Sequence, residues 1–272
     1  MRADTILALD IGAASVKLGV FVPRKGNSLE LARYAVREMD PDPANEEHRM
    51  TDVQLMLQEA RTELGIPNGF PVLISVPGQQ VFSRFVKLPP VSRDKVLQMV
   101  QYEAQQNVPF PISEVVWDYQ FLGSGVGAID VMLAAMKAEL VEQVVDVVMK
   151  AGLRPQLVDV APLALYNAVR YSYSELPPCT LVIDIGARST DLIFIEENRV
   201  FNRSIPVGGN AITQQIAREF DLPFAEAEQL KRTHAFVGLG GAYEAPNSQV
   251  ADKVSKTVRS VMTRLHSEIT RS

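Results

Sequence analysis

The sequence of 272 residues contains one cysteine, Cys179, which excludes a framework of disulfide bonds within the chain. No run of about twenty apolar residues occurs, and this argues against a transmembrane helix. The N-terminal residues lead straight into a short apolar stretch that lacks the longer apolar core and cleavage site of a secretory signal. We therefore expect a cytoplasmic chain for which any contact with a membrane comes through a partner.

Positive charge is also scarce. The 27 Lys and Arg residues are outnumbered by 32 Asp and Glu residues, so the net charge of −5 provides no general attraction for nucleic acid or anionic lipid. The three histidines, His48, His234 and His266, show no spacing typical of metal ligands, and we expect no transition-metal site. Cys179 stands at the start of a predicted strand, where a small buried thiol is the default. The acidic, proline-flanked stretch 40–47 is predicted to be a solvated loop.

An internal repeat is the main organising feature that is present. Residues 6–21 and 181–195 each contain an apolar run that ends in Asp-Ile-Gly-Ala-x-Ser, followed by a second apolar run. Short apolar runs joined by glycine and small residues predict buried strands in a hairpin. The two copies lie far apart in the sequence, which suggests one copy in each of two domains.

The remaining apolar periodicity predicts further helices and strands. Strands are expected at 72–76, 82–88, 117–122, 130–135 and 156–160. Helices are expected at 51–64, 94–106, 141–148, 162–171, 212–220, 227–232 and 250–269, with a loop at 236–247. Alternating strands and helices of this kind predict an α/β fold, with the block from 82 to 152 as an inserted module.

The repeated Asp-Ile-Gly-Ala turn suits a site for Mg²⁺ and phosphate. Small residues let backbone N–H groups approach phosphate oxygens, and the carboxylates of Asp10 and Asp184 can hold Mg²⁺ through water. Ser15, Ser189 and Thr190 add hydroxyl groups, and Lys17 either supplies positive charge to the phosphates or is a solvated strand lysine. Each Asp taken alone is as well explained as the cap of a tight turn, but two matching copies favour nucleotide binding.

The duplicated loop resembles the phosphate loops of the actin, sugar-kinase and heat-shock-chaperone ATPase superfamily, and the seven-residue step from Asp10 to Lys17 matches the actin spacing. Within that superfamily the chain resembles the PilM family of cytoplasmic actin-like proteins of type IV pilus assembly, whose relative is the cell-division protein FtsA. The segments that carry this resemblance are Phe85–Pro90, Val100–Gln105, Val108–Gln120, Pro162–Leu165 and Ala227–Arg232.

The resemblance implies an α/β actin-like ATPase fold, related to ribonuclease H, with two lobes and an FtsA-like inserted subdomain. The first lobe would comprise residues 1–81 and 153–175, the latter including a linking helix, and the inserted βαββα subdomain would comprise residues 82–152. Residues 176–272 would form the second lobe with a small helical subdomain. Family members continue into a glycine-rich adenosine loop after the last helix, so we expect the C-terminal part of this lobe to be missing. Gly238–Gly241 lies before that helix and is interpreted as a surface connection.

The resemblance also implies ATP and Mg²⁺ as cofactors, with Asp10 and Asp184 positioning the metal ion. The residues expected around the phosphates are Gly12, Ala13, Ser15, Lys17, Gly186, Ala187, Arg188 and Thr190. Gly208 and Gly209 would pack under the nucleotide, and Glu228 and Lys231 would reach the ribose and adenine. From the residues alone, the Glu228–Lys231 pair is better explained as a surface salt bridge on one helix face, and only the resemblance favours a role in nucleotide binding.

One departure from the family bears on turnover. Many relatives carry an acidic or amide residue before the proline of the connecting segment, whereas Ala161 precedes Pro162 here. Asp159 and Gln156 are the polar residues left nearby, and Asp159 is the candidate catalytic residue. Loss of a group that orients water affects the transition state more than binding, so we expect at most a weak ATPase.

The leading function is therefore an ATP-binding assembly protein of a type IV pilus or a related secretion machine. The resemblance implies that it binds the N-terminal cytoplasmic segment of the inner-membrane protein PilN in an apolar groove between the first domain and the inserted module, alongside other pilus assembly components. This would place it at the inner membrane through its partner. Three alternatives stay open: a small-molecule kinase of the same superfamily, a scaffold that does not use nucleotide, and an FtsA-like cell-division protein.

Overall fold

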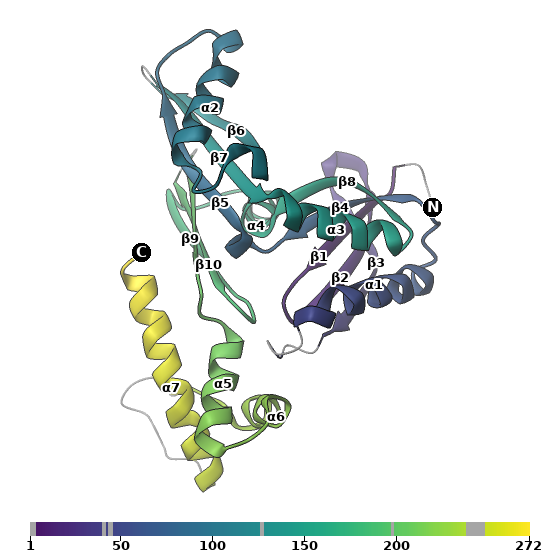
Figure 1. The fold of residues 1–272 in the computed structure, drawn as a ribbon, viewed down its shortest axis with the longest axis vertical. Coiled ribbons are helices and arrows are strands. Elements are labelled where there is room, and N and C mark those ends of the chain that lie inside the picture. The colour runs from purple at the N-terminus through teal and green to yellow at the C-terminus, as the bar shows by residue number, and fades with distance from the viewer. Residues whose placement is uncertain (1–3, 40–41, 43–45, 126–127, 197–198, 238–247) are drawn as a thin grey trace. The chain divides into compact units, whose positions relative to one another are not determined.

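The structure, a computed structural model, describes residues 4–39, 42, 46–125, 128–196, 199–237 and 248–272 (Figure 1). The strands are β1 (Ile6–Ile11), β2 (Ser15–Pro23), β3 (Leu29–Glu38), β4 (Phe70–Val76), β5 (Val81–Leu88), β6 (Val115–Gly125), β7 (Ala128–Lys137), β8 (Leu153–Val160), β9 (Cys179–Ile185), β10 (Thr190–Glu196) and β11 (Arg199–Ile205). The helices are α1 (Glu46–Glu63), α2 (Arg93–Asn107), α3 (Ala138–Lys150), α4 (Ala161–Ser172), α5 (Gly209–Phe220), α6 (Phe224–His234) and α7 (Gln249–Thr270).

The chain divides into two compact units. Unit 1 comprises residues 1–39, 47–182 and 193–202, and unit 2 comprises residues 40–46, 183–192 and 203–272. A three-stranded sheet with the order β11-β10-β9 contributes residues to both units. The boundaries 1–81, 82–152, 153–175 and 176–272 expected from the sequence remain a prediction.

A five-stranded sheet with the order β3-β2-β1-β4-β8 forms the centre of unit 1. Strand β1 runs antiparallel to β2 and parallel to β4, and β4 runs parallel to β8. Alternate residues of β1 are buried, and these residues share a hydrophobic core with the apolar stripe of α1 and with buried valines of α3. Asp10 has the opposite parity on β1, so its side chain lies on the face away from this core.

The inserted block, also in unit 1, is a second sheet with the order β5-β7-β6 and a helix, α2. Val96, Val100 and Ala104 lie on one face of α2 at a spacing of four residues and are buried in the core of this block. The packed helix and sheet give the block a hydrophobic core of its own.

Unit 2 contains a helical group. Helices α5, α6 and α7 contact one another, and Ile216, Ala227, Val254 and Val258 form their shared core. Asp221 ends α5 in the left-handed conformation (φ 53°), which aspartate tolerates better than most residues.

The elements predicted from the sequence are confirmed in type, but two strands were missed. Strands β3 and β11 each follow one of the duplicated hairpins. Most side chains of β3 are exposed, including Leu29, Leu31 and Tyr34, so its apolar residues do not mark a buried face.

Two smaller expectations are wrong. Cys179 is exposed, because it begins β9, an outer strand of its sheet, where Leu181 and Ile183 of the same parity are exposed as well. The predicted loop 40–47 ends early, since α1 begins at Glu46. Most of that loop lies outside the described residues, as does Gly238–Gly241.

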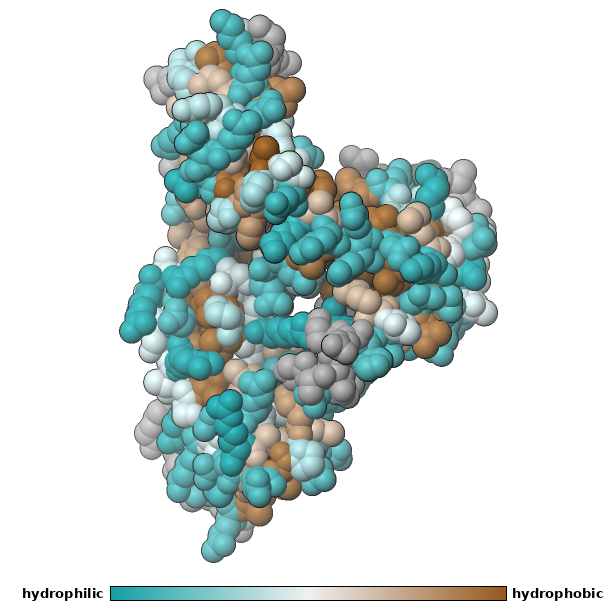
Figure 2. Space-filling model, viewed as in Figure 1, coloured by the Kyte–Doolittle hydropathy of each residue, from teal (hydrophilic) through white to brown (hydrophobic). Residues whose placement is uncertain are grey.

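Hydrophilic side chains cover most of the face seen in Figure 2, with apolar side chains scattered among them. Within the part of the chain that the structure describes, no helix combines the length and apolar character needed to cross a membrane.

Candidate functional site

The two Asp-Ile-Gly-Ala turns have the same build. The N–H of Gly12 donates to the carbonyl of Ser15 (3.0 Å), and the N–H of Gly186 donates to the carbonyl of Ser189 (2.9 Å). A Cβ atom at Gly12 would lie 3.1 Å from the Ser15 oxygen, and one at Gly186 would lie 3.0 Å from the Ser189 oxygen. Both turns therefore disfavour a side chain at the same position for the same steric reason.

In unit 1, polar side chains form a row across the carboxyl ends of three parallel strands. Asp10 of β1 is in register with Ser75 of β4, and Ser75 is in register with Asp159 of β8. Lys17 of β2 pairs with Asp10 across the hairpin, with its Nζ atom 2.8 Å from the Asp10 Oδ2 atom. Asp159 uses its Oδ1 atom to accept the N–H of Val160 (2.8 Å), one residue before the helix that begins at Ala161. Open α/β sheets bind ligands at this end of their strands.

Arg49 fixes the backbone of the first turn. This residue lies in the first turns of α1, is only 8% exposed, and donates from Nη2 to the carbonyl oxygen of Gly12 (2.6 Å). Arg49 could not be identified from the sequence, because nothing local indicates which loop an arginine of this helix reaches.

In unit 2, the start of α5 fixes the second turn in an equivalent way. The N–H of Gly209 donates to the carbonyl of Gly186 (2.9 Å), and the N–H of Asn210 donates to the carbonyl of Ala187 (2.7 Å). A Cβ atom at Gly208 would lie 2.5 Å from the Gly186 oxygen, a distance that no side chain can occupy. In both loops, therefore, the glycine carbonyl is already bonded to a donor from another segment, which makes the loop less repulsive to an anion.

The hydroxyl of Thr190 is engaged within the protein. Thr190 is fully buried and donates from Oγ1 to the carbonyl of Val207 (2.7 Å), next to Gly208. This bond ties the hairpin to the glycine pair, so the side chain contributes to the shape of the loop.

Glu228 and Lys231 belong to a partly buried cluster and are not a loose surface pair. Lys231 Nζ lies 2.6 Å from Glu228 Oε2, 2.9 Å from Thr213 Oγ1 and 3.3 Å from the carbonyl oxygen of Gly209. Thr213 Oγ1 in turn lies 2.6 Å from Glu228 Oε2. Burial alone would raise the pKa of Glu228, but hydrogen bonds from Lys231, Thr213 and Arg232 outweigh it and lower the pKa. The cluster thus places an ionised carboxylate and an ammonium group beside the glycine pair.

Asp191 is a second residue that the sequence analysis did not single out. Its side chain is 7% exposed, and burial raises its pKa, an effect that the nearby charge of Asp184 reinforces. The Ser204 hydroxyl is close enough to offset part of this shift. Among the described residues, however, neither Asp191 Oδ1 nor Ser204 Oγ has a hydrogen-bond partner.

The expected site residues thus fall into two groups. Unit 1 holds Asp10, Gly12, Ala13, Ser15, Lys17 and Asp159, and unit 2 holds Asp184, Gly186, Ala187, Arg188, Thr190, Gly208, Gly209, Glu228 and Lys231. Within each unit, strand pairing, hydrogen bonds and ion pairs bring most of these residues together. Thr213 and Ser75 join them, and only the fold reveals these two residues.

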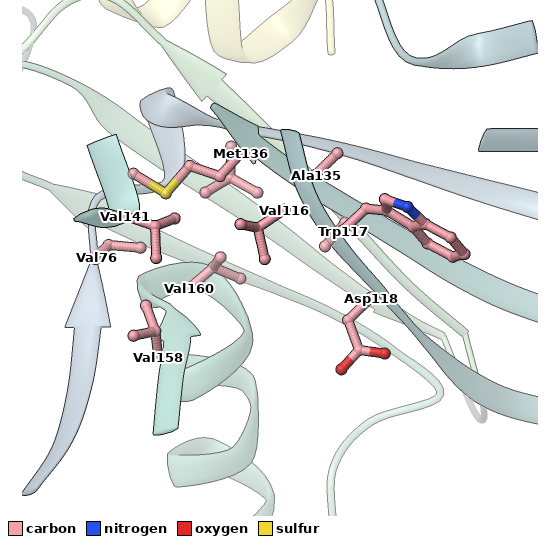
Figure 3. A pocket seen from close by; sticks show the side chains of 11 residues that line it. Val76, Val116, Trp117, Asp118, Ala135, Met136, Val141, Val158 and Val160 are labelled. Carbon is pink, nitrogen blue, oxygen red and sulfur yellow. The ribbon is translucent and has the colours of Figure 1, made fainter. Parts of the chain in front are cut away.

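Unit 1 also contains an apolar cavity of about 110 Å³ where the inserted block meets the ends of β4 and β8. Its lining residues are Val76, Val81, Val116, Trp117, Asp118, Ala134, Ala135, Met136, Val141, Val158 and Val160. Val116, Val141 and Val160 converge in Figure 3, whereas the ring of Trp117 points away from them. Asp118 is the one charged residue among these lining residues.

These observations define the class of protein. A sheet that begins with an antiparallel hairpin and continues into parallel strands, the duplicated Asp-Ile-Gly turn and the inserted block of β5, α2, β6 and β7 together make an α/β fold of the actin-like ATPase type.

Comparisons with known proteins identify the family. Residues 8–245 match the family model described as Type IV pilus assembly protein PilM, so the chain belongs to this family. The structure is similar to that of a "PilM-PilN type IV pilus biogenesis complex", with a TM-score of 0.80 and 28% identity over 100% of this chain and 76% of that one.

Two further similarities are limited, one in the length that it covers and the other in sequence identity. FtsA of Neisseria meningitidis serogroup B is 32% identical over 127 residues, which make up 44% of this chain and 30% of FtsA, so the match spans under a third of that curated relative. The ethanolamine utilization protein EutJ of Carboxydothermus hydrogenoformans has a TM-score of 0.56 and 15% identity over 100% of this chain and 72% of its own, which indicates a shared fold.

Proposed function

We propose that this protein binds ATP with Mg²⁺ through its two Asp-Ile-Gly turns, as a component of a type IV pilus or related secretion machine. The observation that carries the proposal is the shared build of the turns, in which each glycine carbonyl is bonded to a separate donor. Two turns of one chain that are fixed in the same way by unrelated segments are better explained by a common ligand than by turn geometry alone.

The residues of both turns fit a nucleotide and its metal ion. Mg²⁺ prefers oxygen ligands and keeps several waters, and Asp10 and Asp184 supply carboxylates at the strand ends. The small residues Gly12, Ala13, Gly186 and Ala187 leave room for phosphate oxygens, with Ser15, Lys17 and Arg188 beside them. Thr190 supports the second loop through its bond to the Val207 carbonyl. The ionised Glu228 and the Lys231 ammonium offer an acceptor and a donor for the ribose and the base, above Gly208 and Gly209.

Calorimetric titration of MgATP tests this proposal. Wild type should bind, and Asp184→Asn should bind at least about tenfold more weakly, since a lost charge interaction with the metal ion costs on the order of 1.4 kcal/mol or more. Asp146→Asn removes an exposed carboxylate that pairs with Lys150 on α3 and serves as the control. Equal affinities of wild type and Asp184→Asn would refute binding through the two turns.

Hydrolysis is proposed to be weak at most. Ala161 offers no group to orient water, and Asp159 Oδ1 already accepts the N–H of Val160. If Asp159 contributes to hydrolysis, Asp159→Asn will lower the turnover of ATP and leave the affinity of the protein for ATP almost unchanged. Transfer of phosphate to an added sugar would instead indicate a small-molecule kinase.

We propose that the apolar cavity of unit 1 receives the N-terminal cytoplasmic segment of a PilN-like inner-membrane protein. The support is the similarity to a PilM–PilN complex together with the apolar character of the cavity. An extended segment could insert an aliphatic side chain among the valines and place a polar or basic group near Asp118. Such a partner would hold this chain at the inner membrane from the cytoplasmic side.

A matched pair of substitutions tests the cavity. Val116 on β6 and Leu97 on α2 are both exposed and apolar, so a lysine at either position should leave the fold intact. Val116→Lys should weaken binding of a synthetic peptide of the partner's N-terminal segment about tenfold or more, because it puts a charge into an apolar site. Leu97→Lys should bind like wild type, and equal losses in both variants would count against this site.

A further inference from the structure

Thr213 of α5 lies at the centre of the polar cluster beside the glycine pair. It is fully buried, and its Oγ1 atom lies 2.6 Å from Glu228 Oε2, 2.9 Å from Lys231 Nζ and 3.1 Å from the carbonyl oxygen of Gly209. The hydroxyl proton can reach either acceptor, and the shorter distance favours Glu228. The ammonium group of Lys231 can only donate, so Oγ1 accepts from it. One hydroxyl group thus bonds to both members of an ion pair.

The same cluster is connected to the second Asp-Ile-Gly-Ala turn through Gly209. Lys231 Nζ lies 3.3 Å from the Gly209 carbonyl oxygen, and the N–H of this glycine donates to the carbonyl of Gly186 (2.9 Å). Thr213 follows Gly209 by one turn of α5, so its side chain lies over the same part of the helix. The position of Thr213 therefore affects both the ion pair and the segment that fixes the second turn.

The hydroxyl group of Thr213 does more than fill space. Valine would occupy the same volume, but it would leave Glu228 without one donor and Lys231 without one acceptor in a partly buried place, where lost bonds to charged groups are costly. Hydrogen bonds from Lys231, Thr213 and Arg232 hold the pKa of Glu228 below its usual value. Lys231 and Arg232 are charged and belong to α6, whereas α5 contributes the uncharged Thr213.

We propose that Thr213 is a positioning residue for the nucleoside end of the site, where it holds the Glu228 carboxylate and the Lys231 ammonium group in place for the ribose and the base. The inference rests on the proposed binding of ATP and adds a residue that acts without touching the nucleotide, since Thr213 is fully buried. Through Gly209, Thr213 also keeps the nucleoside end in line with the second turn.

Calorimetric titrations of adenosine and of MgATP into the full chain test the proposal. Thr213→Val should weaken the binding of both ligands about tenfold, as expected when a charged group loses one hydrogen bond. Thr213→Ser keeps the hydroxyl group and should bind both ligands within about threefold of wild type.

Thr233→Val is the matched control. The Thr233 hydroxyl also bonds to the carbonyl four residues earlier, that of Gln229 (2.9 Å), but it lies exposed on α6. This variant should bind both ligands like wild type. An equal loss of affinity in Thr233→Val and Thr213→Val would overturn the proposal, because any lost helix hydroxyl would then have the same effect.

A second measurement needs no ligand. The carboxyl resonance of Glu228, followed by NMR in isotope-labelled protein as the pH changes, reports the pKa of this group. Loss of the Thr213 donor disfavours the ionised form, so the pKa of Glu228 should be higher in Thr213→Val than in wild type, Thr213→Ser or Thr233→Val. An unchanged pKa in Thr213→Val would show that its hydroxyl does not support the carboxylate, and the proposal would fail.

The outcomes separate this inference from the proposed function. If wild type binds MgATP and Thr213→Val binds it equally well, or if serine restores no more affinity than valine, the positioning role is overturned while nucleotide binding stands. If wild type binds neither MgATP nor adenosine, the proposed function fails and the inference fails with it.

Discussion

At the scale of single residues, Gly208 occupies a position that excludes any side chain. Its added Cβ atom would meet backbone atoms of Gly186 and Ala187 at 2.5–2.9 Å, and backbone cannot move aside as a flexible side chain can. The neighbouring Gly209 differs, since its Cβ atom would come no closer than 3.4 Å, to the Nζ atom at the far end of the Lys231 side chain.

This contrast predicts the outcome of two alanine substitutions. Gly208→Ala should lower the free energy of unfolding by about 1–3 kcal/mol, the usual cost of overpacking. Gly209→Ala should change it by no more than about 0.5 kcal/mol. Urea unfolding of both variants would check this, and comparable losses would show that the close approach at Gly208 is not the cause.

Arg49 is expected to act on phosphate binding through the backbone of the first turn. Without its bond to the Gly12 carbonyl, that oxygen is free to turn toward an anionic ligand, and a buried positive charge is lost. Arg49→Met should therefore weaken ATP binding about tenfold, or about 1.4 kcal/mol, and Arg49→Lys less.

Adenosine provides the control ligand for Arg49, because it lacks phosphates. Its affinity should be the same in wild type and in Arg49→Met, provided that the variant is folded. Equal weakening of ATP and adenosine would point to a general structural defect.

The lowered pKa of Glu228 predicts a pH dependence of stability. A carboxyl group with a folded pKa below its ordinary value of 4.5 stabilises the native state above that pH, and this contribution is lost as the pH falls through the folded pKa. Glu228→Gln should hence be less stable than wild type near pH 7, and the difference should shrink below about pH 4.5. Denaturant unfolding across this range, with the exposed Glu142→Gln of α3 as a control, measures the effect; a constant difference would contradict it.

At the scale of elements, α7 is held by one apolar stripe. Val254, Val258, Val261 and Leu265 are buried, while Val250 of the same helix is 43% exposed. Leu265→Ala should destabilise unit 2 by about 2–5 kcal/mol, because it leaves a cavity in a packed core. Val250→Ala should cost no more than about 0.5 kcal/mol. Thermal unfolding of the two variants distinguishes them, and a mild effect of Leu265→Ala would indicate that the stripe is loosely packed.

Helices and buried strands of this chain were predictable because their burial is periodic in the sequence. Valines and leucines at helical spacing located α1 and α7, and apolar runs ending at Asp-Ile-Gly located β1 and β9. Strand β3 escaped prediction because pairing with β2, rather than a buried face, defines it. Strand β11 does bury Val200 and Ile205, but mostly polar residues separate these two positions and leave only a weak apolar pattern. The exposure of Cys179 follows from the place of β9 in the sheet, which its own residues do not specify.

At the scale of the whole molecule, each compact unit carries one copy of the duplicated turn. If one nucleotide needs both turns, removing the aspartate of one turn should weaken nucleotide binding nearly as much as removing both aspartates. We expect Asp10→Asn and Asp184→Asn each to reduce the stabilisation by MgATP, and the double variant to be little worse than the weaker single one. Melting temperatures with and without MgATP measure this, and fully additive losses would indicate two independent sites.

The sequence by itself determined the actin-like class, the duplicated turns and most of the residues around them. It could do so because Asp, Gly and small residues in a tight turn act locally, through backbone conformation and close approach. The tertiary structure alone decided which distant groups lie beside each turn: Arg49 and Ser75 beside the first, and the start of α5 with Thr213 beside the second. Those contacts depend on the packing of segments far apart in the chain, and no spacing in the sequence records them.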